Sequence, residues 1–347
     1  MAEGLVVTAP AGIPSRSAGA FTSPRARRRY VIVVAILAVL AVGSGFGLLA
    51  GGNPMPPGSE GFWRIAQHRA TDVTVMVLVA IAQAVATVSF QTVTNNRIIT
   101  PSIMGFESLY RVVQTSTVYL LGVAGVVAIQ GVGQFAIQVA IMVGLAVALY
   151  GWLLSGRYGN LQIMLLIGIV IGGGLGAVST FMQRLLTPSE FDVLTARLFG
   201  NVSNADPSYL PLAIPLVVAA SVLLWLRSRR LDLMALGSDA ARSLGLDHRR
   251  ELFIVLFLVA VLMATSTALV GPMTFLGFLV ATLAYQFADT YDHRLIFPVA
   301  VLTAFTILAG AYFVMKNIFY AQGMVSILIE LVGGTVFLIV ILRKGRL

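Results

Sequence analysis

The feature that most constrains this chain is a series of long apolar runs, such as YVIVVAILAVLAVGSGFGLLA at residues 30–50. Crossing a bilayer as a helix takes about 20 such residues. Lipid offers no hydrogen bonds, so the backbone of each run must be satisfied within a helix or a closed barrel, and these runs are continuously apolar rather than alternating. Charged residues make up only 11% of the chain, against about 25% in soluble domains. The sequence therefore predicts an all-α, polytopic membrane protein.

The apolar runs predict about ten transmembrane helices. Their approximate limits are 30–50, 72–94, 102–122, 132–153, 160–184, 207–227, 251–270, 272–287, 296–316 and 323–342. One boundary depends on Gly271 and Pro272. Because proline fits the first turn of a helix and disrupts its interior, we expect a tight turn here, followed by a short helix. The alternative is a single kinked span, which would change the parity of the count.

The 23 lysine and arginine residues are unevenly distributed among the segments that join these helices. With ten helices most of them fall on one side, which the positive-inside rule assigns to the cytoplasm together with both termini. The rule also explains the net charge of +9 without a nucleic-acid partner. Residues 1–29 are predicted to form a disordered, basic cytoplasmic tail, and 30–347 a single transmembrane domain. A cleaved signal peptide is disfavoured because the run at 30–50 exceeds a typical signal core.

Motifs for enzymatic chemistry are missing from the sequence. It contains no cysteine, no G-x-x-x-x-G-K-[ST] phosphate loop, and no H-E-x-x-H or G-x-S-x-G motif. The three histidines, His68, His248 and His293, lie in different connecting segments. There we expect solvated or interfacial side chains rather than metal ligands. The sequence thus predicts neither a metal site nor an active site, and any use of ATP would require a partner.

Ionisable residues within the predicted spans are candidates for function, because charge inside a membrane is costly. Glu107 precedes Arg111 by one helical turn, and this spacing places both side chains on one face. They either neutralise each other or form a polar contact on a substrate path. Glu330, in the last span, has no local partner. Such acids keep open the alternative of an ion- or proton-coupled secondary transporter that works without an ATPase.

Glycines recur at close spacing in two of the spans. In the fifth, Gly168, Gly172 and Gly176 are four residues apart, and Gly173 lies beside them. This small-xxx-small spacing allows helices to approach closely in lipid. Gly333 and Gly334 are similar features of the last span. The pattern favours a helix interface or the lining of a translocation path.

The segment LMALGSDAARSLGLDHRR, residues 233–250, is a charged loop between two apolar runs. Ser238 is the expected N-cap of a short helix, Asp239 favours its N-terminal end, and Gly245 is its expected stop. The resulting helix has roughly two turns, with Ala240, Ala241 and Leu244 available to a partner. The alternative is that this helix anchors to lipid, although the small residues of the helix suit a protein cleft better.

This loop, together with the following ALVGPMTFLGFLVATLAYQ, resembles the cytoplasmic coupling loop of the iron–siderophore ABC importer permeases. These are FecCD-type permeases, related to the cobalamin importer permease. A second block, SFQTVTNNRIITPSIMGFESLY, resembles the region that joins the second and third spans in that family. The resemblance extends over roughly residues 30–345.

The resemblance implies a permease subunit of an ATP-driven importer, in the bacterial cytoplasmic membrane, that moves ferric siderophores. Implied partners are a cytoplasmic ABC ATPase dimer, a second permease subunit and an extracytoplasmic siderophore-binding protein. ATP and Mg²⁺ would be used by the ATPase, and this chain would bind no cofactor. The expected ATPase contact is Leu236, Gly237, Ser238, Asp239, Ala240, Ala241, Arg242, Leu244, Gly245 and Leu246. The expected translocation path or permease interface is Gly168, Gly172, Gly173, Gly176, Glu107, Arg111, Glu330, Gly333 and Gly334.

Basic residues of the outer segments, Arg64, Arg69 and Lys316, are the expected contacts for the binding protein. Many family members carry two arginines at the outer start of the second span. Arg69 matches the first of these, whereas Asp72 stands where the second is often found. This departure weakens a docking scheme based only on arginine–carboxylate pairs.

Overall fold

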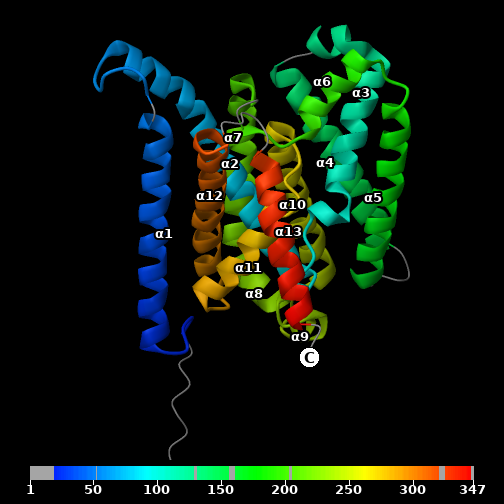
Figure 1. Cartoon of the computed structure of the whole chain (residues 1–347). Coiled ribbons are helices and arrows are strands. Elements are labelled where there is room, and N and C mark those ends of the chain that lie inside the picture. Colours follow the sequence, from blue (N-terminus) through cyan, green and yellow to red (C-terminus); the bar gives the residue numbers. More distant parts are fainter. Residues whose placement is uncertain are drawn as a thin grey trace, which may run out of the picture.

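In the computed structural model the described parts of the chain are residues 19–51, 53–128, 131–155, 161–202, 205–319 and 325–344. All regular structure in these parts is helical (Figure 1). The helices are α1 (Pro24–Ala50), α2 (Glu60–Val93), η1 (Ser102–Met104), α3 (Phe106–Ala128), α4 (Val132–Ser155), α5 (Leu161–Gln183), α6 (Pro188–Leu198), η3 (Pro207–Tyr209), α7 (Leu210–Leu226), α8 (Ser228–Met234), α9 (Ser238–Ser243), α10 (His248–Val270), α11 (Leu276–Ala288), α12 (His293–Asn317) and α13 (Val325–Lys344).

Each of the ten predicted spans coincides with one of these helices. Seven helices in the described parts are long and apolar enough to cross a membrane, while α11 and α13 are shorter apolar helices. Helix α3 is interrupted by a non-helical backbone at Gly122. Helix α1 begins at Pro24, before the predicted start at 30, so the arginines of the RARRR segment are helical. Residues 1–18 of the predicted tail lie outside the described residues.

The centre of the bundle is formed by α2, α10 and α12, and α2 packs against both of the others. The most apolar windows of α2 and α10 are 78% and 72% buried, whereas that of α5 is only 17% buried. Figure 1 shows α1 at one edge of the bundle and the group α3, α4, α5 and α6 at the other. The two edges expose many large apolar side chains, as α7 and α13 also do, whereas the centre is packed like a protein core.

The first residues of α1, helix α9 and the last residues of α13 lie at the same end of the bundle (Figure 1). An even number of crossings would produce this arrangement. Helix α6 lies at the opposite end. We call the two ends the α9 end and the α6 end.

The connection at Gly271 has the predicted form. Helix α10 ends at Val270, Gly271 adopts a left-handed backbone with φ of 85°, and α11 begins at Leu276. The single kinked span is therefore wrong. Because a side chain strains the backbone at such a φ value, glycine is the natural residue at this turn.

The predicted close approach of the glycines in α5 is confirmed, and its partner is the segment that leads into α3. A Cβ atom added at Gly172 would lie 3.0 Å from the Cα atom of Gly105, and one added at Gly168 would lie 3.2 Å from the carbonyl oxygen of Met104. Gly173, one position further along, has open space where its Cβ would be. The same helix thus has one face against η1 and α3 and another face that is uncovered in this subunit.

This difference predicts opposite effects for two neighbouring substitutions. Gly172→Ala should lower stability by about 1–3 kcal/mol, because the new methyl group meets backbone that cannot rotate away. Gly173→Ala should leave stability unchanged or raise it slightly, since alanine is the better helix former. The midpoint of thermal unfolding in detergent measures both, and equal midpoints for the two variants would contradict the prediction.

Candidate functional site

The charged loop folds into two short helices, α8 and α9, between the long helices α7 and α10. Glycines with positive φ flank α9: Gly237 has a φ of 97° and Gly245 one of 82°. The prediction that Ser238 is the N-cap is wrong. Gly237 occupies that position, and the Ser238 hydroxyl instead donates to the Asp239 carboxylate at 3.1 Å. Glycine can take the backbone angles that start this helix directly after α8, and the serine falls inside it.

Helix α9 has one buried side and one open side. Ala241 is fully buried against the bundle, so the expectation that it faces a partner is wrong. The remaining predicted contact residues are exposed or half-buried. Leu236 and Leu244 are the large apolar residues of this element, at 63% and 59% exposure. Two exposed leucines beside exposed arginines form a surface suited to a protein partner.

Helix α8 is tied to α10 by an ion pair with two arginines. The Glu251 carboxylate, in the first turn of α10, accepts from Arg227 at 2.5 Å through one oxygen and from Arg230 through the other. The Glu251 side chain is only 4% exposed. A carboxylate buried with two guanidinium partners makes charge-assisted hydrogen bonds, which are stronger than neutral ones.

On its other side, α8 is tied to α12 and α2 through His293. Asp232 of α8 lies 2.6 Å from Nδ1 of His293 and accepts from the His293 backbone N–H at 3.1 Å. The other ring nitrogen, Nε2, lies 2.7 Å from the hydroxyl of Thr92 in the last turn of α2. His293 is 3% exposed and His248 is 8% exposed, so neither is solvated, which was one of the two expected settings; each is the first residue of a long helix, α12 or α10. We name the chain Asp232–His293–Thr92 the histidine link.

The intramembrane charges are arranged differently from the prediction. Glu107 accepts a hydrogen bond of 2.7 Å from the hydroxyl of Thr274, which lies between α10 and α11. No ion pair joins Glu107 and Arg111 in the described part of the chain, and Arg111 is exposed. Glu330 of α13 lies within electrostatic range of Glu107. The two acids therefore come together around one threonine, which their sequence positions do not reveal.

The glycines of the last span also permit a close approach. A Cβ atom added at Gly333 would lie 2.6 Å from the Cβ atom of Phe275, so α13 packs tightly against the start of α11. At Gly334 the nearest atom would be the ring of Phe275, at 3.9 Å. Gly333 is thus a packing position within this subunit.

The three predicted docking residues lie towards the α6 end, in different settings. Arg69 donates to the carbonyl oxygen of Gly51 at 2.6 Å, and so joins α2 to the end of α1. Lys316 lies over the ring of Tyr312, whose hydroxyl donates to Asp72 at 3.3 Å. Arg64 is exposed and pairs with Glu60 of the same helix at 2.9 Å. Of the three, Arg64 is the most open to a partner.

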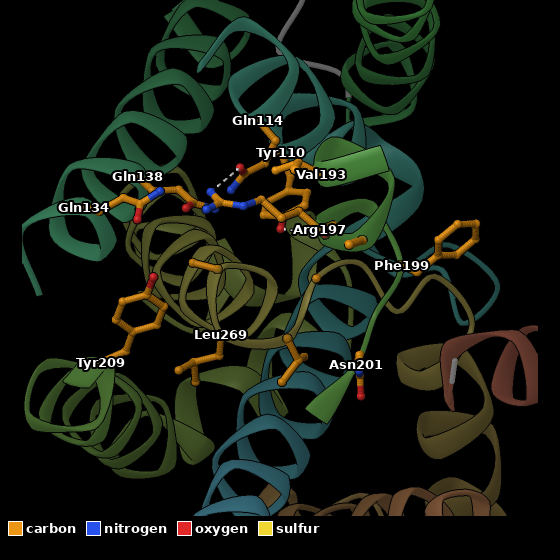
Figure 2. Close-up of a pocket in the computed structure, with 14 residues that line it drawn as sticks. Tyr110, Gln114, Gln134, Gln138, Val193, Arg197, Phe199, Asn201, Tyr209 and Leu269 are labelled. Atoms are coloured by element: carbon orange, nitrogen blue, oxygen red, sulfur yellow. Dashed lines mark hydrogen bonds between the residues drawn. The ribbon is translucent and has the colours of Figure 1, made fainter. Parts of the chain in front are cut away.

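A polar cavity of about 350 Å³ lies at the α6 end, among α3, α4, α6, η3 and the end of α10. Figure 2 shows Gln114, Gln138 and Arg197 along one wall, with the Tyr209 hydroxyl pointing towards them. Gln138 is 8% exposed, and its Nε2 atom has no hydrogen-bond partner in the described part of the chain. The cavity can hold water or the oxygen atoms of a polar solute. The sequence pattern that could have predicted this cavity is the presence of glutamines in otherwise apolar runs.

A metal centre is not apparent in the described ranges. They contain no cluster of three or more His, Asp or Glu side chains that could hold a metal ion. The described residues near α9 hold arginines, leucines and buried ion pairs. These residue types are suited to binding another protein.

Comparison with known proteins agrees with the resemblance found in the motifs. Residues 31–343 match the model of the FecCD transport family. The petrobactin import system permease protein FatC of Bacillus anthracis is 51% identical over 96% of this chain and 94% of its own length. YclO, a petrobactin import system permease protein of Bacillus subtilis, is 36% identical over 80% of this chain and 89% of its own length.

A solved structure shares the fold. It is described as an inward-facing conformation of a metal-chelate type ABC transporter, and it superposes with a TM-score of 0.77 at 20% identity, covering 90% of this chain and 99% of its own. The family match spans nearly the whole bundle, from the first helix to the last. This chain belongs to the FecCD transport family.

Proposed function

We propose that this chain is the permease subunit of an ATP-driven ABC importer that moves a ferric siderophore across the bacterial cytoplasmic membrane. The observation that carries the proposal is the α8–α9 element, a charged helical pair with an exposed apolar surface, in a chain of the FecCD family. The chain carries no phosphate loop of its own. A partner must therefore supply the energy from ATP and Mg²⁺, and α9 is the surface that receives it.

In this scheme the α9 end faces the cytoplasm, and both termini lie there. The residues from Leu236 to Leu246 contact the ATPase dimer, with Leu236 and Leu244 as the apolar anchors. Buried Ala241 instead fixes α9 to the bundle. The α6 end faces outwards and receives the binding protein, with exposed Arg64 as one contact. Arg69 supports this surface by fixing the end of α1.

The relatives that match this chain indicate which siderophore it transports. Two proteins at 51% and 36% identity are permeases of petrobactin import systems, so we assign ferric petrobactin as the substrate. Bacillus anthracis has a second petrobactin import permease, FatD, which is 27% identical to this chain. The difference in identity supports a heterodimer, in which this chain takes the FatC position. The open face of α5 beside Gly173 is the proposed contact with the second permease or the path between them.

The function is tested by reconstitution. The chain is purified with its second permease and ATPase, placed in liposomes, and supplied with binding protein and radiolabelled ferric petrobactin. We expect uptake only when ATP is present on the side of the membrane that carries the ATPase. Uptake driven by a pH gradient without nucleotide would overturn the proposal in favour of a proton-coupled carrier that uses Glu107 and Glu330.

The coupling surface has its own prediction. Leu244→Glu should weaken binding of the ATPase to the permease by at least about tenfold, because it places a charge at an apolar anchor of the interface. Thermal stability of the permease should not change, since Leu244 is 59% exposed. Met55→Glu is the matched control, with Met55 47% exposed near the other end of the bundle. Equal affinities of the two variants, measured by pull-down titration in detergent, would contradict the assignment.

A further inference from the structure

We propose that the histidine link, Asp232–His293–Thr92, transmits the displacement of the coupling helix α9 to α2 and from there to α5. The inference deepens the proposed function and rests on it. It assigns a positioning role to two buried side chains, Thr92 and His293, and to Asp232, whose side chain is 13% exposed; none of the three is proposed to touch substrate or nucleotide.

Helix α9 cannot move independently of α8. The Gly237 N–H, at the start of α9, donates to the carbonyl oxygen of Met234 in α8 at 3.0 Å. Leu231 and Met234 of α8 are buried in the core, and α9 packs against α8 and α10. A force applied to the exposed side of α9 therefore reaches α8 as a rigid displacement.

From α8 the route leads to α12 through a short, directional contact. The Asp232 Oδ1 atom meets both the backbone N–H of His293, at 3.1 Å, and the ring atom Nδ1, at 2.6 Å. An ionised carboxylate can only accept hydrogen bonds, so Nδ1 carries a hydrogen atom and donates the hydrogen bond to Asp232. This fixes the ring and aims Nε2 at the Thr92 hydroxyl, 2.7 Å away. Two contacts on one residue hold both the position and the orientation of His293.

Thr92 then connects the link to the backbone of α2. Its hydroxyl also lies 2.8 Å from the carbonyl oxygen of Val88, and its single proton can be donated to that oxygen or to Nε2, but not to both at once. Helix α2 ends at Val93, and the following connection is fastened back to it: the Gln91 amide donates to the carbonyl oxygen of Arg97 at 2.8 Å. The connection continues into η1 and Gly105, which pack against Gly168 and Gly172 of α5. The route from α9 to α5 is thus an unbroken series of packed or hydrogen-bonded groups.

The second attachment of α8 has a different character. Arg227 and Arg230 join α8 to α10 through Glu251, and Arg230 is 54% exposed. This attachment lies close to the turn between α7 and α8 and can serve as a pivot. The histidine link lies further along α8, towards α9, and faces α2 and α12. A helix held at one point and linked at another acts as a lever.

The polar groups of the link also point to a role beyond stability. Asp232 Oδ2 is buried and has no hydrogen-bond partner within the described ranges. A buried polar atom without a partner costs free energy, and this oxygen leaves the carboxylate an acceptor position that a second arrangement of the link can use. Coupling networks need groups that can occupy two discrete arrangements.

The test uses the complete importer, in liposomes, and two threonines of the same helical turn. Thr92→Val removes the hydroxyl that meets His293 while keeping the shape of the side chain. Thr94→Val is the matched control, because Thr94 is equally buried and, among the described residues, its hydroxyl donates only to backbone carbonyl oxygens of α2, those of Phe90 at 2.8 Å and Gln91 at 3.4 Å. The measured quantity is the number of ferric chelates imported per ATP hydrolysed, together with the unfolding midpoint of each complex.

We expect Thr92→Val to lower the transport-to-hydrolysis ratio by roughly two- to tenfold relative to Thr94→Val, at similar unfolding midpoints. Thr92→Ser, which retains the hydroxyl, should restore the ratio. Asp232→Asn should also lower it, because it removes the charge that orients His293. If Thr92→Val and Thr94→Val give equal ratios, the inference is overturned. A native complex without ATP-driven uptake would instead overturn the proposed function, so the two failures are distinguishable.

Discussion

The bundle depends on the requirement that a chain in lipid must satisfy most of its polar groups internally. The backbone meets this requirement by forming helices, but lipid provides little hydrophobic drive to bring those helices together. Association must therefore come from close packing and from polar contacts between helices. The bundle uses both: glycines bring α5 and α13 against their neighbours, and buried polar pairs join α8, α10 and α12.

These two means of association are separated in space, and the separation has functional meaning. The ion pairs of Glu251 and the histidine link gather around α8 at the α9 end, where an ATPase would act. The polar cavity and the exposed arginine lie towards the other end, where a binding protein would act. Between them the centre of the bundle is packed with small and apolar side chains of α2, α10 and α12. A tightly packed centre transmits displacement between the two ends better than a fluid one.

The helices were predictable from sequence because each is encoded by its own apolar run. The turn at Gly271 and the short helix near Asp239 were predictable for the same reason, since glycine, proline and charge act locally. The polar contacts were not. Asp232 and His293 are 61 residues apart, and Thr92 and His293 are 201 apart, so no local pattern joins them. The local spacing of Glu107 and Arg111 could not show that the hydroxyl of the distant Thr274 donates to the carboxylate, while no ion pair joins the two residues in the described part of the chain.

The contact between Gly105 and Gly172 has one more consequence. Where two helices meet through side chains, rotation about χ angles can absorb small movements, as a flexible joint does. At this point the main chains themselves meet, and neither residue has a χ angle. A shift of the segment before α3 therefore cannot be damped locally, and α5 must translate with it or lose the contact. Even a sub-ångström displacement of the segment before α3 is therefore expected to reach α5 undiminished.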